Sequence, residues 1–174
     1  MKLTVFLSTI LCVGAQDFAE QASRALGPLY TRAIDANPGN HMYYYLRGYL
    51  YEVLGKLSLS IADLTKCLQL NPNFDKARFM RAQLYLKHGQ FDDAAGDFDI
   101  IIKSGKSDFA EKSREHVSTI SITKKALQDF DYYMRKNKLT QANESSSKIV
   151  EVYAYLTPGN AILYQSSKET CRVI

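Results

Sequence analysis

Residues 33–98 read AIDANPGNHMYYYLRGYLYEVLGKLSLSIADLTKCLQLNPNFDKARFMRAQLYLKHGQFDDAAGDF, and this stretch repeats itself at an offset of 34 residues. The matched positions are Asn37-Pro38 with Asn71-Pro72, Gly48 with Ala82, Tyr51 with Tyr85, Gly55 with Gly89, and Leu64 with Phe98. So many correspondences at one offset are improbable by chance, and a period of this size is typical of repeat architectures.

Within each period the apolar residues fall at helical spacing. Tyr44, Gly48 and Tyr51 share one helix face, and Gly55 interrupts the pattern midway. The Asn-Pro pair ends the second helix, because a residue before proline avoids the α region and proline lacks the backbone donor. Each period is therefore predicted to be two antiparallel helices joined at a glycine.

The pattern resembles the tetratricopeptide repeat (TPR), in which helix A carries an aromatic, a small residue and a tyrosine. Helix B of that repeat carries alanine, phenylalanine and proline. The first period departs from it at Ser60, where alanine is usual, and the second has Lys106 in place of the proline. The resemblance implies an all-α TPR helix-turn-helix solenoid, wound as a right-handed superhelix.

The period divides the chain into segments. We expect a signal peptide (1–15), a partial TPR that contributes a helix B (16–40), two TPRs (41–74 and 75–108), a helical connector (109–122), a degenerate TPR (123–156) and the truncated helix A of a further repeat (157–174).

The first fifteen residues have the features of a secretory signal. Lys2 precedes an apolar run, and Val13-Gly14-Ala15 supplies the small residues of a cleavage site. A buried helix is the alternative interpretation. Cleavage would place the mature chain in an oxidising compartment. Of the remaining cysteines, Cys67 is predicted to be a core thiol, and the pairing of Cys171 stays open.

Composition and motifs narrow the function classes. The chain has 174 residues, which suits one domain or two small ones, and a net charge of +4, which does not by itself indicate nucleic acid. The longest apolar run is about half a membrane span, so no membrane insertion is expected. No phosphate loop, nucleophile motif or metal-ligand spacing is present, so we expect no cofactor, no metal and no catalysis.

A signal peptide followed by these repeats resembles the DnaJ homolog subfamily C member 3 family, lumenal co-chaperones of the endoplasmic reticulum with TPRs and a J domain. The resemblance implies a module that binds unfolded or misfolded polypeptides. A J domain needs a His-Pro-Asp loop, and proline follows none of His41, His88 and His116. Contact with the lumenal heat-shock chaperone, which requires a J domain, is therefore not expected of this sequence. The alternative is a TPR scaffold for one partner, such as a stress-activated eIF2α kinase that it inhibits.

TPR proteins bind through the concave face, so the residues that match its helix A positions are the candidate client-binding residues. They are Met42, Tyr45, Tyr49, Phe79, Leu86, Leu127 and Met134. Tyr45 and Tyr49 lead this set because they lie four residues apart on one stripe. Met and aromatic side chains suit extended apolar segments, although any one of them could instead be core. The inner positions lack the basic residues of the TPR carboxylate clamp.

The interpretation of two further sequence features stays open. A basic stretch between Lys103 and Lys125 could touch RNA, but acidic residues interrupt it and a solvated helix face is the simpler interpretation. Asn143-Glu144-Ser145 is a glycosylation sequon that lies inside a predicted helix B.

Overall fold

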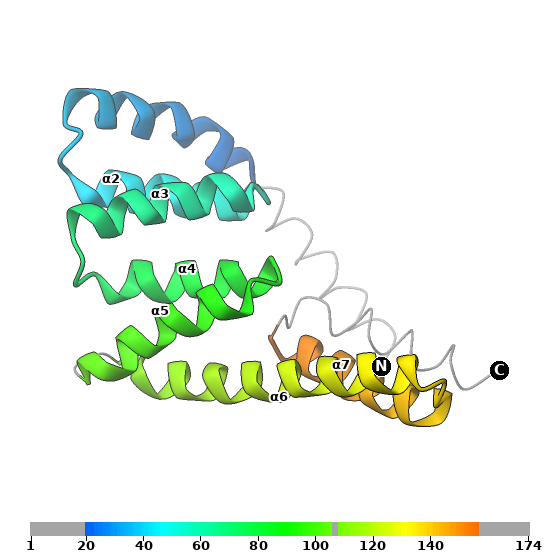
Figure 1. Ribbon diagram of the computed structural model, residues 1–174. Coiled ribbons are helices and arrows are strands. Elements are labelled where there is room, and N and C mark those ends of the chain that lie inside the picture. Colours follow the sequence, from blue (N-terminus) through cyan, green and yellow to red (C-terminus); the bar gives the residue numbers. More distant parts are fainter. Residues whose placement is uncertain (1–19, 106–107, 157–174) are drawn as a thin grey trace, which may run out of the picture. The chain divides into compact units, whose positions relative to one another are not determined.

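The computed structural model describes residues 20–105 and 108–156, and this part of the chain contains helices and turns but no strand. The helices span residues 20–36, α2 (His41–Val53), α3 (Leu57–Leu70), α4 (Asp75–Lys87), α5 (Phe91–Ser104), α6 (Ala110–Arg135) and α7 (Leu139–Leu156) (Figure 1). The predicted signal peptide, the segment 157–174 and Cys171 lie outside the described residues.

Local sequence rules determine where the helices begin and end. The Asn40 side chain accepts a hydrogen bond from the Met42 backbone N–H (3.0 Å) and so caps the start of α2. Gly55 and Gly89, which follow α2 and α4, have φ values of +68° and +76°, a region that side-chain-bearing residues rarely adopt. Asn71, just before Pro72, ends α3.

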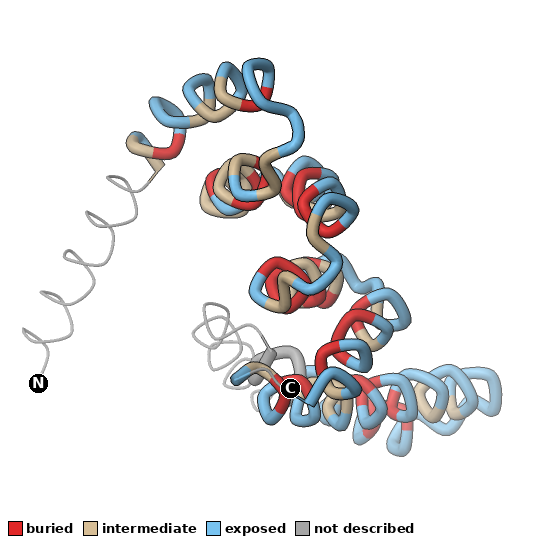
Figure 2. The backbone as a smooth tube through the Cα atoms, turned by 90° about the vertical axis from the view of Figure 1, so that its left-hand side faces the viewer, coloured by how far each residue is buried: buried red, intermediate tan, exposed pale blue. Residues whose placement is uncertain are grey.

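The chain divides into two compact units between Leu84 and Tyr85, and each is described by itself. In the first unit the helix over 20–36, α2, α3 and α4 share one hydrophobic core, and the buried positions fall along particular sides of the helices (Figure 2). The buried members of this core are Ile34, Tyr44, Tyr45, Leu64, Cys67, Leu68, Ala77, Met80 and Leu84.

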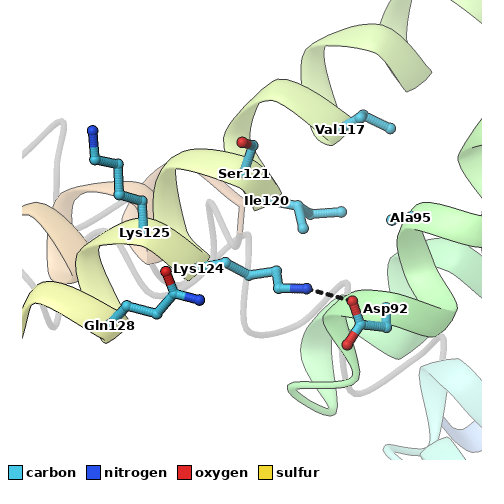
Figure 3. Close-up of a pocket in the computed structure, with 8 residues that line it drawn as sticks. All are labelled: Asp92, Ala95, Val117, Ile120, Ser121, Lys124, Lys125 and Gln128. Atoms are coloured by element: carbon cyan, nitrogen blue, oxygen red, sulfur yellow. Dashed lines mark hydrogen bonds and ion pairs between the residues drawn. The ribbon is translucent and has the colours of Figure 1, made fainter. Parts of the chain in front are cut away.

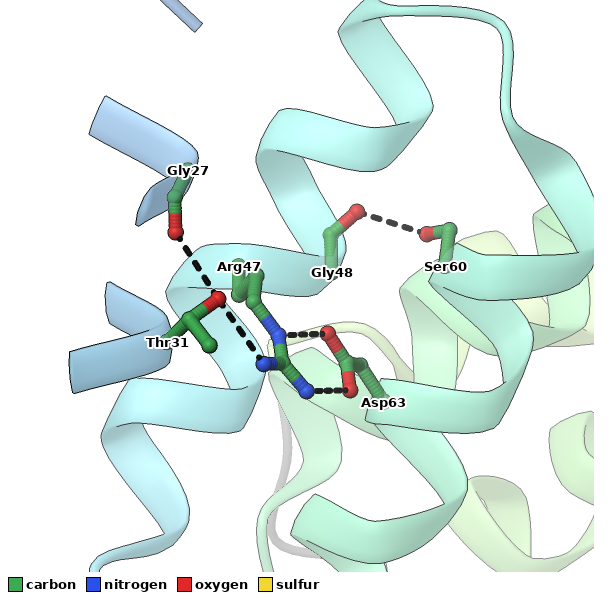
Figure 4. Close-up of polar contacts among 6 residues, drawn as sticks. All are labelled: Gly27, Thr31, Arg47, Gly48, Ser60 and Asp63. Atoms are coloured by element: carbon green, nitrogen blue, oxygen red, sulfur yellow. Dashed lines mark hydrogen bonds and ion pairs between the residues drawn. The ribbon is translucent and has the colours of Figure 1, made fainter. Parts of the chain in front are cut away.

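Helices α2 and α3 approach each other closely at Gly48. A Cβ atom built on Gly48 would lie 3.3 Å from Leu64 Cγ and 3.4 Å from the Ser60 backbone oxygen, so only glycine fits without displacing a neighbour. The buried Ser60 hydroxyl donates a hydrogen bond to the Gly48 carbonyl oxygen at 2.7 Å (Figure 4). Serine in place of the usual alanine therefore joins the two helices at their contact point.

A polar cluster beside this contact joins three helices. Arg47 of α2 donates two hydrogen bonds to the Asp63 carboxylate of α3, both at 2.7 Å, and a third to Thr31 Oγ1 at 3.2 Å (Figure 4). Thr31 in turn donates to the Gly27 carbonyl oxygen. Hydrogen bonding to Asp63 holds the pKa of the Arg47 guanidinium above its usual value. The bidentate geometry fixes the relative position of the helices as well as pairing the charges.

The same polar residues recur at the repeat offset. Arg81 donates to Thr65 Oγ1 at 3.0 Å, and these residues follow Arg47 and Thr31 by 34 positions each. Asp97 stands 34 positions after Asp63 and is buried. We did not predict this polar repeat, although the identities at the offset were visible in the sequence.

In the second unit α6 packs against both α5 and α7. Its 26 residues form one continuous helix, so the predicted boundary between a connector and a repeat at residue 123 falls inside it. The buried residues of α6 are small or apolar, among them Ser113, Ile120 and Ala126. The predicted division into repeats remains a prediction.

We expect the Gly48→Leu variant to lose about 1–3 kcal/mol of unfolding free energy, because the added side chain overpacks the α2–α3 contact. Gly96 in α5 is the matched control, since a Cβ there would meet no atom within 4 Å. Gly96→Leu should lose nothing, because leucine also has the higher helix propensity. Chemical unfolding of both variants measures this, and equal losses would contradict the close approach at Gly48.

We also expect Asp63→Ala to cost about 2–4 kcal/mol, because it leaves the mostly buried Arg47 guanidinium without its carboxylate. The control is Glu111→Ala, which removes an exposed ion pair with Arg114 and should change stability by no more than about 0.5 kcal/mol. The same thermal or chemical unfolding measurement applies. A loss for Asp63→Ala as small as the control's would show that the cluster contributes no net stability.

Candidate functional site

Two large side chains on α2 remain open to solvent. Met42 is 37% exposed and Tyr49 is 50% exposed. They lie seven residues apart, which places them on the same side of the helix and about 10 Å apart along its axis. Both belong to the set predicted to bind clients, and α2 therefore presents two apolar anchors on one side.

Tyr45 lies between these anchors in the sequence, but it is only 8% exposed. Its ring packs edge-on against Phe74, with the ring centroids 5.1 Å apart, and the Lys76 ammonium lies 5.7 Å from its centroid. The expectation that Tyr45 lines an open surface is therefore wrong. Phe74, which enters from the turn before α4, covers the ring, so Tyr45 supports α2 from within the core.

Phe79 and Leu86 of α4 are buried as well, which corrects the prediction that they are accessible. The physical reason is that α4 is covered on more than one side. Every residue from Ala77 to Met80 is buried, so the helix has no single apolar stripe to turn toward solvent.

On α6 the remaining two candidates, Leu127 and Met134, are both exposed. They also lie seven residues apart, but Asp131 lies between them and forms an ion pair (2.7 Å) with Arg135, which directly follows Met134. This surface therefore mixes apolar and charged groups, whereas the α2 surface is mainly apolar. We name Met42 and Tyr49 the α2 anchors.

A groove of about 540 Å³ lies between α5 and α6. Lys124 of α6 reaches across it to Asp92 of α5 (2.5 Å), and Ile120 points toward Ala95 (Figure 3). We did not predict this groove. When two consecutive helices run antiparallel, residues at similar distances from the connecting turn face each other. Asp92 and Lys124 lie at similar distances from the turn between α5 and α6, so the sequence could have indicated their pairing.

Few of the described residues have the features of a reactive or metal-binding group. The Cys67 thiol is free and fully buried, and burial raises its pKa to about 11, which keeps it protonated and unreactive as predicted. Within residues 20–105 and 108–156 no group of three or more His, Cys, Asp or Glu side chains could hold a metal. In the same part of the chain no helix is both long and apolar enough to span a bilayer.

Comparison with known proteins supports the fold. Models of the tetratricopeptide repeat match residues 43–74 and 64–95. The crystal structure of the P58(IPK) TPR domain superposes with a TM-score of 0.65 at 24% identity, over 88% of this chain and 46% of that one. Residues 43–95 therefore match tetratricopeptide repeats, and the predicted all-α TPR solenoid is confirmed. The handedness of its superhelix stays a prediction.

Similar curated proteins include DnaJ homologues and a co-chaperone that carries tetratricopeptide repeats and a J domain. DnaJ homolog subfamily C member 3 from Homo sapiens is 37% identical over 97 residues, which are 56% of this chain and 19% of the relative. The tetratricopeptide repeat and J domain-containing co-chaperone DNJ1 from Cryptococcus neoformans var. grubii is 30% identical over 136 residues, or 77% of this chain and 25% of the relative. The resemblance to this family is confirmed, and the chain spans no more than a quarter of these relatives' length.

His116 is a titratable group at the α5–α6 contact. Its imidazole stacks on Phe98 with the ring centroids 4.9 Å apart and the planes 18° apart. Burial lowers the pKa of His116, and the smaller opposing effect of Glu115 does not cancel this. His116 is thus held neutral over a wider pH range in the folded chain than in the unfolded one.

This difference predicts a pH dependence. The unfolded chain takes up the proton at its ordinary pKa of about 6.5, before the folded chain does, so stability falls as pH drops below that value. We expect the wild type to lose more stability between pH 7.5 and pH 5.5 than His116→Phe, which keeps an aromatic ring on Phe98. Unfolding curves at several pH values test this, and parallel pH profiles for the two proteins would refute it.

Proposed function

We propose that this chain holds unfolded or misfolded polypeptides in the lumen of the endoplasmic reticulum, as the TPR module of a DnaJ-type co-chaperone. The observation that carries the proposal is the pair of α2 anchors, which stay exposed on a helix whose other large apolar residues are mostly covered. Similarity to co-chaperones of the DnaJ subfamily C member 3 type supports it.

The two anchors suit a client without a strict sequence. Burying each against a client side chain contributes up to about 1.5–3 kcal/mol before ordering costs. Methionine adapts its shape to irregular partners, and tyrosine gives a large contact area with few torsions to immobilise. The separation of the anchors, about 10 Å, equals roughly three residues of extended chain. A client segment in the polyproline II conformation, with three residues per turn and a rise of about 3.1 Å per residue, places side chains three positions apart on one side and about 9 Å apart, so it fits both anchors.

The lumenal location rests on the charged, apolar and small-residue pattern of residues 1–15 together with the family resemblance. Stimulation of the lumenal heat-shock ATPase belongs to a J domain, and residues 1–174 contain no His-Pro-Asp sequence. The function proposed for these residues is therefore capture of the client.

The test replaces both anchors, as Met42→Ser with Tyr49→Ser, and measures affinity for a fluorescently labelled, permanently unfolded polypeptide. We expect affinity to fall at least about tenfold, since a loss of 1.4 kcal/mol is enough for that. Leu59→Ser is the matched control, because Leu59 on α3 is 49% exposed, as Tyr49 is, but belongs to a different helix. Circular dichroism checks that both variants keep their helices.

Three outcomes would count against the proposal. Unchanged affinity of the double variant removes the α2 anchors from the binding surface. Binding to one defined protein, such as a stress-activated eIF2α kinase, but not to unfolded polypeptides favours the scaffold alternative. A steep loss of binding with added salt indicates an electrostatic partner such as RNA, because release of counterions makes such binding depend on salt.

A further inference from the structure

We propose that Asn143 on α7 is an N-glycosylation acceptor that is modified before α7 folds. The inference rests on the proposed lumenal location, since the transferase acts there. Asn143-Glu144-Ser145 is the only Asn-x-Ser/Thr sequence in the 174 residues. Any N-linked glycan on this chain therefore maps to one known position.

The structure has room for a glycan at this position. Asn143 is exposed, whereas Ala142 and Ser145 on the same helix are buried. Since α7 packs against α6, the buried residues mark the packed side of α7 and Asn143 lies off that side. A carbohydrate on Asn143 would extend into solvent without displacing a core side chain.

In the folded helix, however, Ser145, the second residue of the sequon that the transferase recognises, is buried. The Ser145 hydroxyl donates a hydrogen bond to the Gln141 carbonyl oxygen at 3.1 Å and has almost no contact with solvent. The transferase recognises the asparagine amide and the hydroxyl two residues later together. In folded α7 one group faces solvent and the other faces the protein, so transfer must come first.

The sequence of α7 favours late formation of this helix, which this order of events requires. Its middle contains Asn143 and the serines at 145, 146 and 147, which have low helix propensity. The Ser146 and Ser147 hydroxyls both bond to the Asn143 carbonyl oxygen, at 2.8 and 3.0 Å, a side-chain contact that competes with regular helical bonding. A helix of this kind is marginal in isolation, so α7 should form only when it packs on α6.

The reaction needs one co-substrate, an oligosaccharide linked to a lipid through a diphosphate. The Asn143 side-chain nitrogen forms a bond to the anomeric carbon of the sugar, and the bond from that carbon to the diphosphate oxygen breaks. The lipid diphosphate leaves with the bonding electron pair, and the amide nitrogen gives up one proton to a base of the transferase. No oxidation or reduction occurs.

The experiment synthesises the full chain in the presence of endoplasmic-reticulum microsomes and reads two properties of the product. Protection from added protease reports entry into the lumen, and a mass increase of one glycan that an endoglycosidase removes reports transfer. We expect both for the wild type. Asn143→Gln and Ser145→Ala should lose the mass increase, whereas Ser145→Thr, which keeps the hydroxyl, and Ser146→Ala, which keeps the sequon, should retain it.

The order of events has its own test. Purified transferase and its lipid-linked donor are given either the folded, unmodified chain or a synthetic peptide of residues 139–150. We expect the peptide to accept the glycan and the folded chain to stay unmodified. Equal modification of the two would overturn the proposal that transfer precedes folding.

The two proposals fail in different ways. A protected chain without the mass increase overturns the glycosylation site and leaves the lumenal location intact. An unprotected chain overturns the location, and the site is then tested by placing the chain behind the signal sequence of a known lumenal protein. A lack of glycan on that fusion also overturns the site.

Discussion

The close approach of α2 and α3 at Gly48 is the constraint on which the first unit depends. With no side chain at this position, the Leu64 side chain and the Ser60 backbone can come within ordinary contact distance of α2. The Ser60 hydroxyl then bonds to the Gly48 carbonyl oxygen, and Arg47 and Asp63 meet beside it. Removing two charges from water is costly, and the bidentate bonds together with the bond to Thr31 offset that cost.

This contact also decides what α2 presents to solvent. Once one side of the helix is packed against α3 and Tyr45 is covered by Phe74, Met42 and Tyr49 remain exposed. The same packing that stabilises the hairpin thus leaves two anchors at a spacing that an extended polypeptide can match. The α6 surface differs because Asp131, which is paired with Arg135, lies between Leu127 and Met134.

Polar residues, as well as apolar ones, recur from one period to the next. Threonine, arginine and aspartate recur at the 34-residue offset, so a helix B and the following helix A carry the same hydrogen-bonding groups in both periods. Stability in repeat proteins is close to a sum over neighbouring units. A bond that joins neighbouring helices in each period therefore strengthens the array at each step.

The sequence by itself determined the helices, the turns and the class of fold, because glycine, proline and the spacing of apolar residues act within a few positions. It also indicated the family, and it placed Gly48 and Cys67 in packed positions. It could not separate Tyr45 from Tyr49, which lie on one stripe of α2. Only the tertiary structure decided between them, because Phe74, which is 29 positions beyond Tyr45, covers one ring and not the other. The α5–α6 groove was likewise decided by residues 32 positions apart that meet only when the helices pack.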